Sequence, residues 1–423
     1  MMWKKKPAGP CPSAPSAILE AAGPGLPQGL AREAIGLASP SVVSGRIDAN
    51  ATDGAAAPED LLLRAITASD AEARAAFAAW RGRIDLDAPL GDETMALLPL
   101  LYASLQKRAM EDPFMARLKG VSRRVWYENS RLLERAGGTV AALSGAGIPC
   151  LLTGDLPLVL HCHENLSARR IGQADILLRP EGAERAASLL VERGLVVGVP
   201  PRPEEIAYHH EKRFDAPTGM AIVLHWHVLA AAANAATDDF FWHSSEAGEL
   251  EGVAVRRVST QALLLQRLLG AEGLRERMPR LWIADVLALA DGAGPAPDWA
   301  PLADFAIRQK LAGRLTWRLR ALTEAGLPIP DAVIRSLEQA KPSLPEYVDS
   351  LALGGRANRR RPAVLRRSAV LADYLRSARR PGLLARPADF SHFVRHRWGL
   401  KGRRQLLSIL LAKLRRQPRP LQV

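Results

Sequence analysis

The chain has 423 residues, of which 48% are hydrophobic and 24% are charged, a balance typical of proteins that bury a core. This composition excludes disorder throughout the chain, and the length predicts two or three structural units. No stretch approaches 18 consecutive apolar residues, so we expect no membrane-spanning helix. The three cysteines (Cys11, Cys150 and Cys162) form no CxxC pair, which favours a reducing cytoplasm.

The net charge of +13 is distributed unevenly along the sequence. Residues 356–423 contain nineteen Lys and Arg but two acids, Asp373 and Asp389, so this tail carries a net charge of +17. The preceding residues therefore carry a net charge of −4. The basic excess that would attract an anionic partner lies in the last segment of the chain.

The first part of the chain divides into a leader and a helical region. Residues 1–56 are rich in Pro, Gly, Ala and Ser without periodicity, which predicts a disordered leader. Helical signals then fill residues 57–145, with capped starts at Ser69 and Asp92 and a long amphipathic run over residues 114–144. We expect an N-terminal helical region here.

Residues 147–180 (GIPCLLTGDLPLVLHCHENLSARRIGQADILLRP) carry the pattern most typical of a functional site. A short apolar strand over residues 148–152 leads to a turn at Gly154 and then to a helix. A second strand over residues 174–178 begins with Asp175. A glycine turn at a helix N-terminus beside a strand carboxylate is a common way to hold a phosphate and a metal.

The rest of the chain predicts an α+β fold with a mixed β-sheet core over residues 146–258. A C-terminal helical region over residues 259–345 and a basic helical tail over residues 346–423 follow the core. The expected elements are a helix over 183–193, a strand over 195–199, a hairpin of 206–215 with 220–229, a hairpin around Glu251-Gly252, and helices over 262–269, 282–290 and 302–324.

The motifs of this core, taken in order, resemble a family of bacterial nucleotidyltransferase-fold proteins often encoded beside polysaccharide-synthesis genes. Members show GI-hydrophobic-LKG, then RxxGDxD-hydrophobic, then (D/E)LHW. The matching segments here are residues 147–154, 169–175 and 223–226, and the likeness extends over roughly residues 58–335. The resemblance implies transfer of a nucleoside monophosphate from an NTP to an unknown acceptor.

The resemblance also implies roles for particular residues. Asp175 would be the catalytic carboxylate and a ligand of Mg²⁺, and Gly154, Arg169, Gly172 and Gln173 would contribute to NTP binding. Gly154 would let the backbone approach a phosphate, and Arg169 would meet phosphate oxygens, for which a guanidinium is well suited. The alternative for Arg169 is a place in a solvated loop.

The sequence departs from the family where the metal and the phosphates would lie. Gln173 replaces the first acid, Val223 the third acid, Thr153 the lysine and Asp155 a small neutral residue. Since Mg²⁺ is usually held by several hard oxygens, these changes predict weak or lost transfer. Two alternatives stay open: an impaired enzyme, or a non-catalytic binding or regulatory relative that acts in envelope polysaccharide assembly.

Other side chains near the predicted site offer further ligands. Asp155, Glu164 or Glu211 could fold inward and replace a lost metal ligand. A zinc site built from histidines of the first hairpin is a second, less favoured hypothesis, because the family carries a His pair and an LHW strand at these places. The four histidines are His209, His210, His225 and His227.

The tail contains one strongly amphipathic stretch, residues 403–416 (RRQLLSILLAKLRR). Its apolar residues recur at i, i+3 and i+4, and its flanks are cationic, which predicts a helix lying on an anionic membrane surface. The alternative is a last helix that docks onto the protein by its leucine face. Nucleic acid is the least favoured partner, because the tail carries no recognised motif and lacks interleaved aromatic residues.

Overall fold

The structure, a computed structural model, describes residues 57–85, 88–163, 165–217, 219–270, 277–291, 296–348, 368–376 and 386–397. The chain divides into two units, Met1–Ala57 and Pro58–Val423, and every element below belongs to the second unit. The predicted leader and the amphipathic stretch at 403–416 lie outside the described residues.

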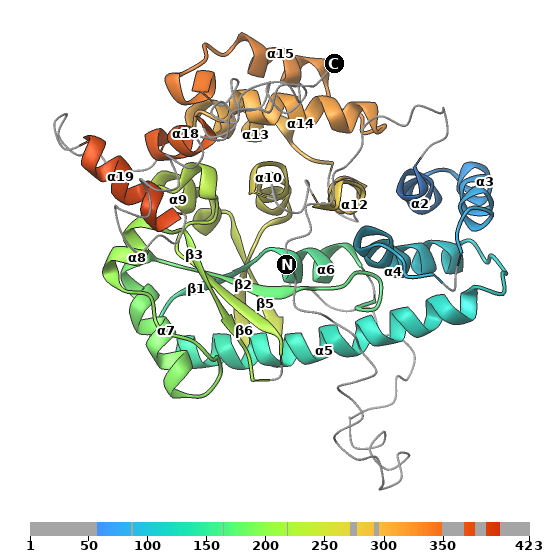
Figure 1. The fold of residues 1–423 in the computed structure, drawn as a ribbon. Helices are drawn as coiled ribbons and strands as arrows, with labels where there is room; N and C mark the ends of the chain where they lie inside the picture. The colour runs from blue at the N-terminus through green and yellow to red at the C-terminus, as the bar shows by residue number, and fades with distance from the viewer. Residues whose placement is uncertain are drawn as a thin grey trace, which may run out of the picture. The chain divides into compact units, whose positions relative to one another are not determined.

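A six-stranded mixed sheet forms the centre of this unit, in the order β3-β4-β2-β1-β6-β5 (Figure 1). β1 is antiparallel to β2 and parallel to β6, β2 is parallel to β4, and the two edge strands close hairpins with their neighbours. The predicted α+β class with a mixed sheet is confirmed. The strands are β1 (Cys150–Thr153), β2 (Gln173–Leu178), β3 (Glu211–Asp215), β4 (Ala221–His225), β5 (Ser245–Leu250) and β6 (Val253–Val258).

Both hairpins form where turn chemistry predicts them, with one correction. Glu251 and Gly252 have φ angles of 50° and 77°, the left-handed pair that a two-residue hairpin turn requires. In the first hairpin the strands are shorter than predicted, because α8 (Pro203–Tyr208) takes up the start of the expected strand. Pro203 at the first helical position and two following glutamates favour a helix there. The predicted strand over 195–199 is reduced to one bridge, between Val197 and Asp215.

In the described part of the chain, four helices precede the sheet and build a separate apolar core. Phe77 and Trp80 of α3 stack on each other, and Trp80 also contacts Phe114 just before α5. Leu281 and Ala284 of α12 join this core, so the N-terminal and C-terminal helices share one interior. The helices are α2 (Pro58–Thr67), α3 (Asp70–Arg81), α4 (Asp92–Lys107) and α5 (Met115–Gly145).

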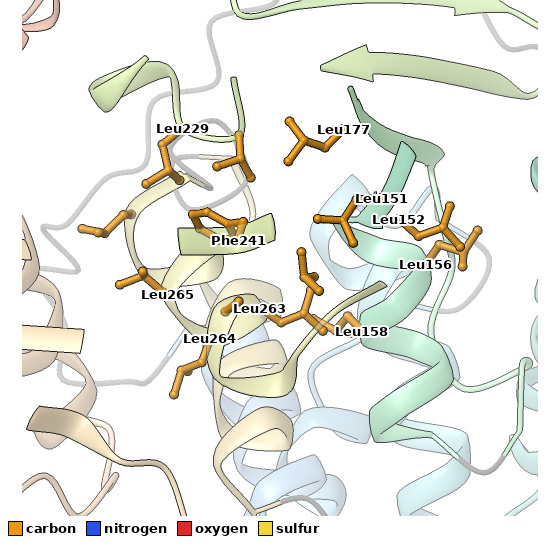
Figure 2. Packing of buried hydrophobic residues seen from close by; sticks show 14 of the residues in the cluster. Leu151, Leu152, Leu156, Leu158, Leu177, Leu229, Phe241, Leu263, Leu264 and Leu265 are labelled. Atoms are coloured by element: carbon orange, nitrogen blue, oxygen red, sulfur yellow. The ribbon is translucent and has the colours of Figure 1, made fainter. Parts of the chain in front are cut away.

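The helices that follow cover both faces of the sheet. α5 and α7 (Ala183–Glu192) pack on one face, and α6 (Asp155–Cys162) and α10 (Thr260–Gly270) lie on the other (Figure 1). Phe241 of α9 (Ala235–His243) lies between the α10 leucines and Leu151 of β1 (Figure 2). This packing fixes where β1 ends and α6 begins.

Of the C-terminal helices, α12 lies beside α10, and α13, α14 and α15 lie above it (Figure 1). The single helix predicted over 302–324 is two helices, because the chain turns at Lys310, whose φ is 60°. α18 and α19 pack together through Tyr374, whose hydroxyl donates to Asp389 at 2.9 Å. No helix in the described ranges is long and apolar enough to cross a membrane. The helices are α12 (Pro279–Asp291), α13 (Trp299–Arg308), α14 (Ala312–Glu324), α15 (Asp331–Gln339), α18 (Ser368–Arg376) and α19 (Arg386–Arg397).

Candidate functional site

The turn between β1 and α6 brings a glycine against a buried carboxylate. Gly154 has a φ of 73°, which allows the strand to turn sharply into the helix that starts at Asp155. A Cβ placed on Gly154 would lie 2.2 Å from Oδ2 of Asp175. No side chain fits between them, so the carboxylate of Asp175 and the backbone of this turn require a glycine.

Asp175 is held in place by neighbours on both sides of β2. Its Oδ1 accepts a hydrogen bond from the amide of Gln173 at 2.7 Å and lies 2.9 Å from Nε2 of His225. Val223 is its register partner on β4 and is buried. The third acid position of the family motif therefore lies beside Asp175, and a methyl-bearing side chain occupies it.

His225 lies between two carboxylates. Its Nε2 faces Asp175, and its Nδ1 lies 3.2 Å from Oε2 of Glu211, its register partner on β3. Burial by itself would lower the pKa of His225, but the hydrogen bond and the charge of Asp175, together with Glu211, outweigh it and raise the pKa. Protonated His225 is therefore a positive charge placed between the two acids.

The remaining polar side chains around the turn bond to one another. The amide oxygen of Gln173 accepts from Arg213 at 2.7 Å, so both ends of this amide are used. The hydroxyl of Thr153 donates to Oε1 of Gln266 at 2.6 Å, and the backbone N–H of Gly154 donates to the same oxygen at 3.2 Å. The side chain of Gln266 on α10 thus accepts both of these hydrogen bonds from the turn.

Two aspartates and two arginines form a buried cluster at the start of α6, which we call the charge quartet: Asp155, Arg169, Arg267 and Asp285. Arg169 binds Asp285 through two parallel hydrogen bonds of 3.0 Å each. Arg267 donates to Asp155, whose carboxylate also lies 3.7 Å from Arg169. The quartet joins α6, the loop before β2, α10 and α12.

The quartet controls the ionisation of Asp155. Burial would raise the pKa of this carboxyl, but the charges of Arg267 and Arg169 and the backbone N–H of Gly172 lower it to about 2. Asp155 is therefore ionised at neutral pH, and two guanidinium groups compensate its charge. The negative charge that the sequence places at this turn is therefore present and is compensated within the protein.

The structure brings the sequence-predicted site residues to one place. Gly154, Asp175 and Gln173 are in contact, and Arg169 and Gly172 lie at Asp155, the next residue in the chain after Gly154. Arg169 is not in a solvated loop, since it is 4% exposed. The predictions that these residues bind NTP and that Asp175 binds a metal stay predictions.

Two histidines of the first hairpin, His210 and His225, share the carboxylate of Glu211, and a third, His227, faces Asp238. His227 lies past the end of β4, with Nδ1 2.7 Å from Asp238, whereas His210 lies 3.2 Å from Glu211. Within the described ranges no three His, Cys, Asp or Glu side chains are arranged to hold a metal ion. The zinc hypothesis therefore has no support from these contacts.

Comparison with known proteins identifies the family. The model of the family described as uncharacterised nucleotidyltransferase matches residues 93–338, more than half of the chain. The chain belongs to this family. Among solved structures, an antigenic nucleotidyltransferase-like protein from Paracoccidioides brasiliensis is similar, with 14% identity, a TM-score of 0.31, and coverage of 51% of this chain and 93% of that chain. A search of the curated proteins found no match.

Sequence reasoning missed the two α10 residues that complete this family member's site. Gln266 and Arg267 are adjacent in a helix that otherwise reads as an apolar segment. Arg267 lies inside this apolar segment, and Asp285 lies inside the apolar α12. Charged residues inside apolar helices are the signal that could have revealed a buried ion pair.

Replacing Arg169 by Met should cost about 3–5 kcal/mol in the free energy of unfolding, because Asp285 is 1% exposed and loses its bidentate partner. The double variant Arg169→Met/Asp285→Leu should be more stable than Arg169→Met alone, since it leaves no unpaired carboxylate. Urea denaturation measures both. The control is Arg124→Met, which removes the ion pair with Glu128 on α5, where the Arg124 side chain is 60% exposed. This substitution should cost less than about 1 kcal/mol.

The stability of the protein should depend on pH through His225. Because folding raises the pKa of His225, its stabilising effect is complete below its unfolded pKa of about 6.5 and is lost as the pH rises through the folded pKa. The wild type should therefore be more stable than His225→Gln, as measured by the free energy of unfolding. This difference should be larger at pH values below the unfolded pKa of His225 than at pH values above its folded pKa. A difference that stays constant, or that grows towards alkaline pH, would contradict the contact with Asp175.

Proposed function

We propose that this member of the nucleotidyltransferase family has lost metal-dependent nucleotidyl transfer and acts as a non-catalytic binding or regulatory protein. The observation that carries the proposal is the state of Asp175, the one acid retained from the family motif. Its Oδ1 is shared by Gln173 and His225, and its Oδ2 faces the backbone of Gly154. The hydrogen bonds that a metal ligand would have to give up are already made inside the protein.

The donor set around Asp175 does not fit Mg²⁺. This ion requires near-octahedral coordination by hard oxygens and is usually bound through one or two carboxylates together with substrate phosphates. Here the neighbouring positions hold an amide, whose oxygen accepts from Arg213, and the apolar Val223. Nε2 of His225 lies 2.9 Å from Oδ1 of Asp175, so a metal at this oxygen would have to displace that contact.

The groups that would hold a triphosphate are also engaged within the protein. Arg169 binds Asp285 and lies near Asp155, and Thr153, at the position of the family's lysine, donates to Gln266. The backbone N–H of Gly154 already has an acceptor, also on Gln266. Anion binding at a helix N-terminus depends on unpaired N–H groups and nearby positive charge, and this turn offers little of either.

The competing function is weak transfer of a nucleoside monophosphate from an NTP to an unknown acceptor, with Asp175 as the catalytic residue. Retention of Asp175 in close contact with Gly154 favours it. A role in envelope polysaccharide assembly in the bacterial cytoplasm, under either function, rests on the family resemblance in sequence.

An activity assay separates the two functions. The wild type and Asp175→Ala should both show negligible Mg²⁺- or Mn²⁺-dependent NTP consumption and self-labelling. The reason is that the metal site lacks the first and third acids of the family motif. The double variant Gln173→Asp/Val223→Glu restores the family's acids while the charge quartet stays intact. We expect it to bind Mn²⁺ more tightly than the wild type, whether or not turnover returns.

Asp155 is left unchanged in that variant because its removal would leave Arg267 without its hydrogen-bond partner. Robust wild-type turnover that disappears in Asp175→Ala would disprove the proposal. Micromolar NTP binding by calorimetry without turnover would instead identify the binding function as nucleotide sensing.

A further inference from the structure

The outer face of α5 carries positive charges and aromatic rings together. The inner face of this helix packs against the sheet through residues such as Leu132 and Val140. Its outer side exposes two large aromatic residues, Trp126 at 46% and Tyr127 at 56%. We call the following set the α5 outer face: Lys119, Arg123, Trp126, Tyr127 and Arg131.

These side chains form one continuous stripe. They follow Lys119 at i+4, i+7, i+8 and i+12, which are positions on the same side of an α-helix. At about 1.5 Å per residue the stripe is about 18 Å long. Because α5 is a single uninterrupted helix of 31 residues, the stripe follows one nearly straight helix axis (Figure 1).

The charge of this stripe is largely uncompensated. In the part of the chain that the structure describes, Lys119 and Arg123 have no acidic partner. Glu128, the acid nearest to them on α5, is shared by Arg124 and Arg170, which lie 2.9 Å and 2.7 Å from it. The charges of the two arginines exceed that of the glutamate, so these three side chains add a net positive charge beside the stripe. Glu134, three residues after Arg131, is an exposed acid at the end of the stripe.

One of the two aromatic rings, that of Tyr127, is held by Arg131 of the same stripe. Arg131 donates to the hydroxyl of Tyr127 at 3.1 Å, and its guanidinium lies 5.9 Å from the centre of that ring. A side chain that is already ordered loses less conformational entropy when a partner binds. Trp126 lies next to Tyr127 in the chain, and nearly half of its surface is exposed, so it is not part of the protein core.

We infer that the α5 outer face binds the surface of an anionic lipid bilayer. Trp and Tyr favour the headgroup region, where one end of the ring is apolar and the other is hydrated, and Lys and Arg are attracted to anionic headgroups. A straight, convex helix face meets a plane along its whole length. Since the apolar side of α5 is already buried in the protein, the helix would rest among the headgroups and not insert.

A nucleic acid would use the same charges but fits the geometry less well. Single strands are bound in grooves, with successive bases stacked on separate aromatic platforms. Trp126 and Tyr127 are adjacent on a convex surface, about 100° apart around the helix. The inference does not depend on the proposed function, and it concerns a surface separate from the cationic tail.

Flotation of the full-length protein with lipid vesicles tests the inference. The wild type should float with vesicles of phosphatidylcholine mixed with phosphatidylglycerol and not with phosphatidylcholine alone. Each Lys or Arg near an anionic surface contributes roughly fivefold to partitioning. Lys119→Ala/Arg123→Ala should therefore weaken partitioning by about 25-fold.

The matched control removes two exposed arginines from the C-terminal helices, Arg308→Ala/Arg335→Ala, and should partition like the wild type. All these proteins keep the tail, so a loss specific to the first variant reports on α5. Brominated lipids in the anionic vesicles should quench the fluorescence of the wild type more than that of Trp126→Phe.

Three results would overturn the inference. The α5 variant could partition like the wild type, or the control could lose as much binding as the α5 variant. Alternatively, Lys119→Ala/Arg123→Ala could abolish binding to a fluorescent oligonucleotide while flotation stays unchanged, which would assign the stripe to nucleic acid.

Discussion

The paired hydrogen bonds between Arg169 and Asp285 are the interaction on which the rest of the site depends. Both side chains are buried, and a buried charge is tolerated when an opposite charge and well-aligned hydrogen bonds compensate it. The pair fixes the loop before β2 to α12, and α12 also packs into the N-terminal helical core. The position of Asp175 on β2 is therefore set by contacts that reach across the sequence.

The same pair explains why few polar groups at the turn remain for a ligand. Arg169 is occupied by Asp285, and Asp155 is compensated by Arg267 and Arg169. His225 contacts Oδ1 of Asp175 at 2.9 Å. In a protein that binds a metal and a triphosphate, the charges of the metal and the phosphates would compensate these side chains. Here side chains of the chain itself compensate them, which supports the proposed loss of transfer.

The fold was largely predictable because its signals are local. Periodicity predicted α3, α4 and α5, and the residues at the Glu251-Gly252 turn predicted the second hairpin. The predicted cap at Asp92 is wrong by one residue, since Gly91 is the N-cap of α4 and Asp92 is its first helical residue. The errors have local causes as well. Lys310 interrupts a run of helical periodicity with a positive φ, and a proline with two acids starts α8 inside an expected strand.

The site was predictable in part, since the sequence determines which residues lie near the turn but not how they pair. The ordered motifs placed Gly154 and Asp175 on adjacent elements. Nothing in the spacing showed that Arg169 would bind Asp285, 116 residues later, or that Gln266 would satisfy Thr153. Long-range pairing of this kind depends on the packing of α10 and α12 over the sheet, which local patterns do not specify.

Mn²⁺ binding to the wild-type protein, followed by electron paramagnetic resonance with Asp175→Ala as reference, is the sharpest test of the lost metal site. It measures the metal itself, so it does not require the acceptor substrate to be known. The two proteins should give the same weak, non-saturating loss of free Mn²⁺ signal. A saturable site in the wild type that disappears in Asp175→Ala would contradict the loss of the metal site.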